Sequence, residues 1–389
     1  MLNVARFQQR PLPAQISRRD FLRVTGGVGI GLIVSAYVPG FAGAADAPKP
    51  STAEAVARSV AAFIKIGPDN TVTVVSKHLE MGQGPYTGLA TLVAEEMDAD
   101  WSQIRAAGGG SNPELYKNFV FGMQGTGGSS SIANSYEQMR TIGATARAML
   151  VAAAAQEWSV PAGEINVRKG VVRSTSGKHA TFGELAERAA QMPAPTSVKL
   201  KDPKQFTLIG KPLGKLDSEV KSTGRAIYTI DVYAPEMLTV VVAHPSRFDA
   251  KAASVDDSAA RKVRGVVDVK VIPQGVAVYA TGFWAAKKGR DALKITWDET
   301  DTETRSTDQL LVEYRSQAKQ QAVTATHRGN VESAFGKASK IIQAEYVFPY
   351  LAHAPLEPLD CTIAMNNGAC HAAFGSQLQT IDHMTIAKV

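Results

Sequence analysis

The stretch Glu80-Met81-Gly82-Gln83-Gly84 places a glutamine between two glycines, directly after an apolar run. That run, Val72 to Val75, alternates in the manner of a strand, and residues from about Thr87 to Met97 predict a helix. Glycine lets the backbone approach a bound group closely, and the start of a helix offers free N–H donors to an anion. This strand–loop–helix junction therefore predicts a compact polar binding site.

A second loop of small residues, Gly125-Thr126-Gly127-Gly128-Ser129-Ser130-Ser131, also leads into a helix-like run. Either loop alone is typical of an ordinary turn, because glycine and serine are common turn residues. Two such loops that each open a helix instead indicate a large cofactor that carries phosphate.

Composition and charge argue against a nucleic-acid partner. The chain has 389 residues, of which 44% are hydrophobic and 20% charged, an ordinary globular composition with room for two or three domains. The formal net charge is +6, but the first 45 residues hold five arginines and one aspartate, so the rest carries only about +2. We therefore predict no nucleic-acid partner.

The two cysteines, Cys361 and Cys370, are too few for an iron–sulfur cluster or a structural zinc site, which take about four ligands. Asn367-Gly368 predicts a hairpin turn. Its register places Cys370 opposite Met365 and Cys361 opposite Phe374, so the two sulfurs do not face each other. We predict that both cysteines are small buried hydrophobic residues rather than a disulfide.

The N-terminus has the layout of a cleavable export signal. The segment Ser17-Arg18-Arg19-Asp20-Phe21-Leu22-Arg23 precedes an apolar stretch at 24–41 and the small residues Ala42-Gly43-Ala44. The paired arginines resemble the twin-arginine signal of bacteria, which exports proteins already folded. This predicts a periplasmic protein, with a retained N-terminal membrane anchor as the alternative.

The remaining pattern predicts an α+β architecture. Phe63 to Ser76 predicts two strands around a turn, and Ser135 to Trp158 a helix with one apolar core face. Thr181 with Glu184 fits a capping box at the start of another helix. Gln191 to Pro212 carries four prolines and predicts an interdomain connector, and short valine-rich strands follow it.

In this order, these pieces resemble the large, molybdenum-cofactor-binding subunit of the xanthine dehydrogenase and aldehyde oxidase superfamily. The nearest resemblance is to its exported branch, typified by isoquinoline 1-oxidoreductase beta subunits, in which the two glycine loops come first. The matching segments are the two loops, Ser222 to Tyr228, His353 to Pro358, and Gly375-Ser376-Gln377.

The resemblance implies a multidomain α+β fold. It has an N-terminal molybdopterin-binding segment, an α/β hammerhead domain and the start of a further molybdopterin-binding domain. The implied boundaries are a signal peptide at 1–45, a linker at 46–62, the molybdopterin-binding segment at 63–190, a linker at 191–214, the hammerhead domain at 215–300, a connector at 301–328 and an incomplete molybdopterin-binding domain at 329–389.

The same resemblance implies the cofactor-binding residues. Gly82, Gln83 and Gly84 are expected to bind the pterin and phosphate portion, and Gly127, Gly128 and Ser129 to add backbone amides. Gln377 is expected to reach an oxo ligand on molybdenum through its amide, which donates and accepts without adding charge. The cofactor that the resemblance implies is molybdopterin with molybdenum; its nucleotide form stays open, with the cytosine dinucleotide as one candidate. No residue of the chain is predicted as a catalytic group or a metal ligand.

The family's reaction hydroxylates an activated C–H bond of an aldehyde or N-heteroaromatic compound with oxygen from water. The resemblance implies that its catalytic glutamate lies beyond this sequence, so the chain alone is expected to be inactive. Glu95 and Glu96 are predicted on a solvated helix face, and Glu357 is predicted to be structural. The resemblance also implies a separate small subunit with two 2Fe-2S clusters and a downstream electron acceptor such as a cytochrome, and the two cysteines of this chain are consistent with clusters held elsewhere.

Two other readings stay open. The chain can be a non-catalytic fragment of a split or broken gene, or a periplasmic binding or scaffold protein. The scattered histidines, among them His78 and His244, are predicted to be satisfied core or surface residues rather than metal ligands. The tryptophans are predicted to pack in cores; they are Trp101, Trp158, Trp284 and Trp297.

Overall fold

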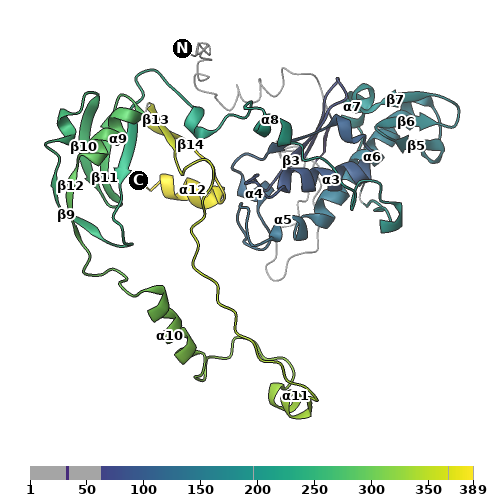
Figure 1. Ribbon diagram of the computed structural model, residues 1–389. Helices are drawn as coiled ribbons and strands as arrows, with labels where there is room; N and C mark the ends of the chain where they lie inside the picture. Colours follow the sequence, from purple (N-terminus) through teal and green to yellow (C-terminus); the bar gives the residue numbers. More distant parts are fainter. Residues whose placement is uncertain (1–31, 35–62, 196, 367, 389) are drawn as a thin grey trace. The chain divides into compact units, whose positions relative to one another are not determined.

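The computed structural model describes residues 32–34, 63–195, 197–366 and 368–388. The predicted twin-arginine motif, cleavage region and linker at 46–62 lie outside these residues. The chain divides into two compact units: Tyr233–Pro358 is one, and the described residues up to Val232 together with those from Leu359 onward form the other. Mixed helix and strand content with several small sheets agrees with the predicted α+β class (Figure 1).

A four-stranded sheet lies in the larger unit. Strand β2 (Ile64–Ile66) pairs antiparallel with β3 (Val72–Ser76), which confirms the predicted two strands. Strand β4 (Ile104–Gly108) runs parallel to β3, and β1 (Leu32–Val34) pairs with β2 at the other edge. Val72, Val74 and Val75 of β3 are all buried, so this strand contributes to the core.

Two helices cover this core. Helix α3 (Pro85–Met97) packs against α6 (Tyr136–Trp158), close to where both were predicted. Gly143 permits the contact, since a Cβ there would lie 2.5 Å from the carbonyl oxygen of Val93. The predicted apolar face of α6 is buried: Met139, Ile142, Ala146, Met149, Leu150 and Ala153.

The rest of this unit consists of short elements. The predicted capping box of Thr181 and Glu184 is present at the start of α7 (Phe182–Ala190). The other elements are α4 (Pro113–Tyr116), α5 (Ser130–Ala133), β5 (Ile165–Arg168), β6 (Val171–Ser174), β7 (His179–Thr181) and α8 (Ser218–Ser222). Strands β5, β6 and β7 form an antiparallel sheet in that order.

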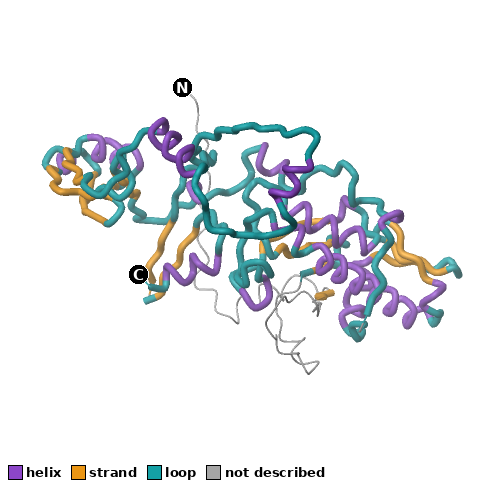
Figure 2. The backbone as a smooth tube through the Cα atoms, turned by 90° about the horizontal axis from the view of Figure 1, so that it is seen from below, coloured by secondary structure: helices purple, strands orange, loops and turns teal. Residues whose placement is uncertain are grey.

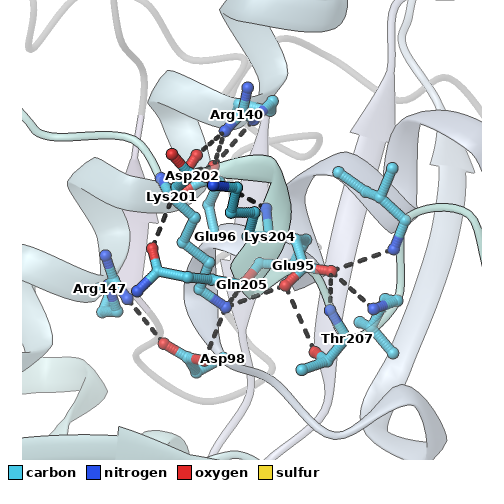
Figure 3. A network of polar contacts seen from close by, with 12 residues as sticks. Glu95, Glu96, Asp98, Arg140, Arg147, Lys201, Asp202, Lys204, Gln205 and Thr207 are labelled. Atoms are coloured by element: carbon cyan, nitrogen blue, oxygen red, sulfur yellow. Dashed lines mark hydrogen bonds and ion pairs between the residues drawn. The ribbon is translucent and has the colours of Figure 1, made fainter.

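Residues 201–209 form a strap, as we call this segment, across the C-terminal end of α3 (Figure 3). Glu95 on α3 is fully buried. Its carboxylate accepts hydrogen bonds from the backbone N–H groups of Thr207, Leu208 and Ile209 at 2.9, 2.6 and 3.0 Å. The Lys201 ammonium lies 3.0 Å from the same carboxylate. Burial alone would raise the pKa of Glu95, but these donors hold that pKa below its ordinary value.

Glu96 binds the strap from the next position. Its carboxylate pairs with the Arg140 guanidinium at 2.7 Å and accepts from the Lys201 backbone N–H at 3.1 Å. Arg140 in turn donates to the Lys201 carbonyl at 2.7 Å. The prediction that Glu95 and Glu96 lie on a solvated helix face is therefore wrong, because a segment distant in sequence covers them. The strap was predicted to lie within a connector, yet it packs as part of the larger unit.

The C-terminal segment also belongs to the larger unit. Strands β13 (Thr362–Asn366) and β14 (Ala369–Ala373) form a hairpin in which Met365 pairs with Cys370, as predicted. Helix α12 (Gln379–Ile386) follows and is yellow in Figure 1. Both cysteines are free, as predicted, but they are exposed. The prediction that they are buried is wrong, because no described element covers this hairpin.

The second unit is built on two small sheets. Strands β8 (Thr239–Ala243), β10 (Val266–Ile272) and β11 (Gly275–Ala280) form one, and β9 (Lys251–Asp256) with β12 (Lys294–Asp298) forms the other. Helix α9 (Phe283–Asp291) contacts β8 and β11. The valine-rich strands β8, β10 and β11 agree with the short strands predicted after the connector. Trp284 is 70% exposed, so its predicted core position is wrong.

Beyond these sheets, the second unit is mostly loop around α10 (Thr307–Gln317) and α11 (Val331–Lys337) (Figure 2). The predicted hammerhead domain starts at 215, whereas the units divide after Val232. The difference arises because Leu216 donates its N–H to Thr87 on α3 at 3.0 Å. Among the described residues, no helix is both long and apolar enough to cross a membrane.

Lys77, directly after β3, is fully buried. Its ammonium donates to the Gln138 side chain at 2.9 Å and lies 3.9 Å from the centre of the Phe119 ring. Burial lowers the pKa of Lys77 to about 7. The folded protein therefore binds fewer protons than the unfolded chain between about pH 7 and about pH 10, where an unfolded lysine titrates.

We expect removal of Glu95 to destabilise the protein strongly. Glu95→Ala leaves three partly buried N–H groups without their acceptor, at about 1–3 kcal/mol for each such group, and removes one of the two carboxylates that pair with Lys201, which keeps Asp98 at 2.7 Å. Urea unfolding measures this loss. The control is Glu157→Ala, which removes one partner of the exposed Arg188 pair and should cost less than about 1 kcal/mol. Equal losses in the two variants would contradict the assigned role of the strap.

We expect Lys77→Met to remove a pH dependence of stability. The burial penalty on the charged lysine is fully present below about pH 7 and fades as pH rises toward about 10. The free energy of unfolding of the wild type should therefore rise relative to that of Lys77→Met over this range. Denaturant titrations at several pH values measure the difference. The exposed Lys65 of β2 supplies the control Lys65→Met, and the same slope in both variants would refute this explanation.

Candidate cofactor-binding site

The first glycine loop connects β3 to α3 and is closed by its own glutamate. The Glu80 carboxylate accepts hydrogen bonds from the N–H groups of Gly82 and Gly84 at 2.8 and 2.9 Å, and from Tyr86 at 3.4 Å. The expectation of free donors at this helix start is therefore wrong for these groups, because Glu80 already fills the position of an anion. These hydrogen bonds instead hold the loop backbone on both sides of Gln83 and so position its side chain.

That side chain is Gln83, which is exposed and makes no side-chain hydrogen bond to any described residue. Gly82 and Gly84 have φ of 95° and 89°, values that favour glycine. Lys215 donates to the Gly82 carbonyl at 3.3 Å and reaches the loop from outside. The first loop thus presents one uncharged amide, with a lysine beside it.

The second glycine loop keeps its donors free. Gly128 and Ser129 are both left-handed, with φ of 59° and 51°, just before α5. Within the part of the chain that the structure describes, the N–H groups of Gly127, Gly128 and Ser129 donate to no protein acceptor. Consecutive amides in such a conformation form a concave donor surface that suits anionic or carbonyl oxygens.

The two loops are joined by direct hydrogen bonds. The Thr126 hydroxyl donates to the Leu79 carbonyl at 3.0 Å, immediately before the first loop. One ring nitrogen of His78 lies 3.0 Å from the Gly125 carbonyl oxygen. Segments far apart in sequence therefore meet at one place.

The C-terminal segment reaches the same place. The Thr126 N–H donates to the Gln377 carbonyl at 2.8 Å, and the Gln124 N–H donates to the Thr380 hydroxyl at 3.0 Å. A Cβ on Gly127 would lie 3.6 Å from Nε2 of Gln377, so the Gln377 side chain adjoins the second loop. Gly125 has no room for a Cβ, which would approach the Leu378 side chain to 2.6 Å.

The structure thus brings together the segments that hold all the predicted site residues: Gly82, Gln83, Gly84, Gly127, Gly128, Ser129 and Gln377. Among the described residues, no hydrogen bond joins Gln83 to the second loop. Their roles as cofactor ligands remain predictions.

The sequence did not identify Glu80 and His78 as the residues that hold the two loops in place. Glu80 could have been found from its spacing, because its carboxylate comes two residues before one glycine and four before the next. No nearby sequence pattern identifies the partners of His78.

The described residues fit a polar ligand at this junction. Gln379, at the start of α12, is buried, and neither atom of its carboxamide has a hydrogen-bond partner among them. Asn134 Oδ1, next to the buried His78–Ser135 pair, is likewise without one. Buried polar groups are normally satisfied, so these atoms indicate a bound molecule or water. Among the described residues, no three His, Cys, Asp or Glu side chains are placed to hold a metal ion.

Comparisons with known proteins agree with this chemistry. The family model described as molybdopterin cofactor-binding domain matches residues 3–242. The beta chain of isoquinoline 1-oxidoreductase from Brevundimonas diminuta is 30% identical over 96% of this chain and 53% of its own length. A protein of Gluconacetobacter polyoxogenes named membrane-bound aldehyde dehydrogenase [pyrroloquinoline-quinone] is 31% identical over 96% of this chain and 49% of its own.

A subunit of nicotinate dehydrogenase from Pseudomonas putida is 28% identical over 90% of this chain and 29% of its own length. The chain therefore spans about half the length of the first two relatives, and less of the third. The match to the family model covers more than half of the chain, and it confirms the resemblance predicted from the two glycine loops. The chain belongs to the molybdopterin cofactor-binding domain family, whose ligand is the molybdenum cofactor.

Proposed function

We propose that the chain holds the molybdenum cofactor at the junction of its two glycine loops, as part of an exported molybdenum hydroxylase. The observation that carries this proposal is the set of free amides at Gly127, Gly128 and Ser129, next to the Gln377 side chain. Donors without acceptors beside an uncharged amide suit the oxygens and ring edge of a pterin phosphate.

Different residues of this chain would bind different parts of the cofactor. The free amides of the second loop would hold phosphate or carbonyl oxygens, and Gln83 and Gln377 would orient the ring and the metal end without adding charge. The Lys215 ammonium would lie near any anionic group that reaches the first loop. When bound, the cofactor supplies the redox chemistry that hydroxylates an activated C–H bond.

The proposed substrates are aldehydes or N-heteroaromatic compounds, with water as the oxygen source. The names of the relatives refer to isoquinoline, aldehyde and nicotinate. One of these names also refers to pyrroloquinoline quinone, a different cofactor. The family model favours molybdopterin for this chain, and chemical identification of the bound group separates the two.

The proposed partners extend the resemblance to enzymes that keep their iron–sulfur clusters on a separate subunit. Electrons would leave through a separate subunit with two 2Fe-2S clusters, and then pass to an acceptor such as a cytochrome; the two free cysteines of this chain are too few to hold such a cluster themselves. The twin-arginine motif at 17–23 supports export of the folded, loaded protein to the periplasm.

The chain on its own is proposed to be inactive. Glu95 and Glu96 are committed to the strap by buried ion pairs and backbone donors, so neither is placed to remove a proton from a substrate. A second candidate follows from the half-length match to relatives, namely a non-catalytic fragment of a split or broken gene. The nucleotide sequence after codon 389 distinguishes the two, since a further open frame that matches the rest of the relatives supports a split enzyme.

We expect the chain, co-purified with the products of neighbouring genes, to contain stoichiometric molybdenum and pterin together with iron. Metal analysis and pterin fluorescence after oxidation measure this content. The purified chain alone should not oxidise an aldehyde with an artificial electron acceptor. Absence of pterin from the complex would refute the proposed function, and turnover by the single chain would refute the proposed inactivity.

We expect Glu80→Ala to reduce cofactor retention. The Gly82 and Gly84 N–H groups lose their acceptor, so the backbone on both sides of Gln83 is no longer held in one conformation. Pterin content per chain after gel filtration is the measurement. Glu114→Ala, an exposed change on α4, is the control. Equal pterin content in Glu80→Ala and the control would show that the first loop does not depend on Glu80.

A further inference from the structure

His78 lies between β3 and the first glycine loop and is fully buried. Its two ring nitrogens contact two different segments. Nδ1 lies 3.0 Å from the Gly125 carbonyl oxygen, and Nε2 lies 3.1 Å from the Ser135 hydroxyl oxygen at the start of α6. A residue without access to solvent therefore links the first loop, the second loop and a core helix.

The contacts determine the tautomer of this histidine. A carbonyl oxygen only accepts, so Nδ1 must carry the hydrogen and donate to Gly125. In the neutral ring Nε2 is then an acceptor, which the Ser135 hydroxyl satisfies as a donor. The amide nitrogen of Asn134, at 3.5 Å, lies on the same side of the ring. A neutral ring thus satisfies both of its nitrogens.

The peptide unit between Gly125 and Thr126 is held at both ends as a result. Its carbonyl accepts from His78, and its N–H donates to the Gln377 carbonyl at 2.8 Å. A peptide unit is planar, so two hydrogen bonds on opposite sides fix the rotation of the whole plane. Together with the backbone angles of the residues after it, this plane sets the direction of the amides of Gly127, Gly128 and Ser129.

We infer that His78 is a positioning residue of the cofactor site: as the neutral Nδ1–H tautomer, it fixes the Gly125–Thr126 peptide plane and thereby aims the free amides of the second loop. The inference rests on the proposed function for what those amides bind. His78 itself is fully buried, and both of its ring nitrogens contact protein groups. It acts through the backbone, as outer partners of ligand groups commonly do.

The surroundings keep the ring neutral. Burial is the main cause that lowers the pKa of His78 to about 4; the Lys77 charge acts in the same direction, and the hydrogen bonds with Gly125 and Asn134 oppose it. Lys77 is the charged neighbour among the described residues; Asn134 and Ser135 are neutral. An unfolded histidine titrates near 6.5, so the folded state loses stability as pH falls from about 6.5 to about 4.

Two substitutions separate positioning from simple packing. In His78→Asn the side-chain amide nitrogen can occupy the place of Nδ1 and donate to Gly125. In His78→Gln the amide falls nearer the place of Nε2, so the donor to Gly125 is lost. The control is His244→Asn in the other unit, where an exposed histidine also donates from Nδ1 to a backbone carbonyl, that of Gln274, at 3.0 Å.

The first measurement uses the cofactor-free chain and nitrogen-15 NMR with labelled histidine and glycine. We expect His78 to be protonated on Nδ1. The Gly127 and Gly128 amide signals should shift in His78→Gln and return close to their wild-type positions in His78→Asn. Protonation on Nε2, or equal shifts in both variants, would overturn the inference whether or not the chain binds pterin.

The second measurement is pterin content of the complex purified with its neighbouring gene products. We expect at least about a tenfold loss in His78→Gln, with His78→Asn and His244→Asn near the wild type. Wild-type content in His78→Gln would overturn the inference while the proposed function stands. A wild-type complex without pterin would instead overturn the proposed function, and the NMR result would still decide the role of His78.

Discussion

The Gly125–Thr126 peptide unit is the point on which the geometry of the site depends. His78 holds its carbonyl and Gln377 holds its N–H, while the Thr126 side chain ties it to Leu79. Three segments that are distant in sequence therefore share one rigid plane. The loss of any one of these contacts would leave a buried polar group unsatisfied, which is why the loops keep a single arrangement.

The two glycine loops look alike in sequence but behave differently. Glu80 fills the donors of the first loop, so that loop presents a side chain, Gln83. The second loop has no such internal acceptor among the described residues, and its backbone amides stay available. A cofactor held between them would meet an uncharged amide on one side and a concave row of N–H groups on the other.

Local pattern predicted much of this fold but not its long-range polar contacts. Periodicity located α3, α6 and most strands, and the hairpin register placed Met365 opposite Cys370. It failed for Glu95 and Glu96, because the strap that covers them comes from a distant part of the chain. The predicted glycines and Gln377 lie on segments that meet, whereas the role of His78 depends on partners that no local pattern reveals.

Hydrogen–deuterium exchange of the complete complex, compared with and without its cofactor, tests most directly whether both loops enclose one ligand. We expect peptides that contain Gln83 and peptides that contain Gly127 to Ser129 to exchange more slowly together when the cofactor is bound. Slower exchange in one loop only, or in neither, would contradict a shared binding site.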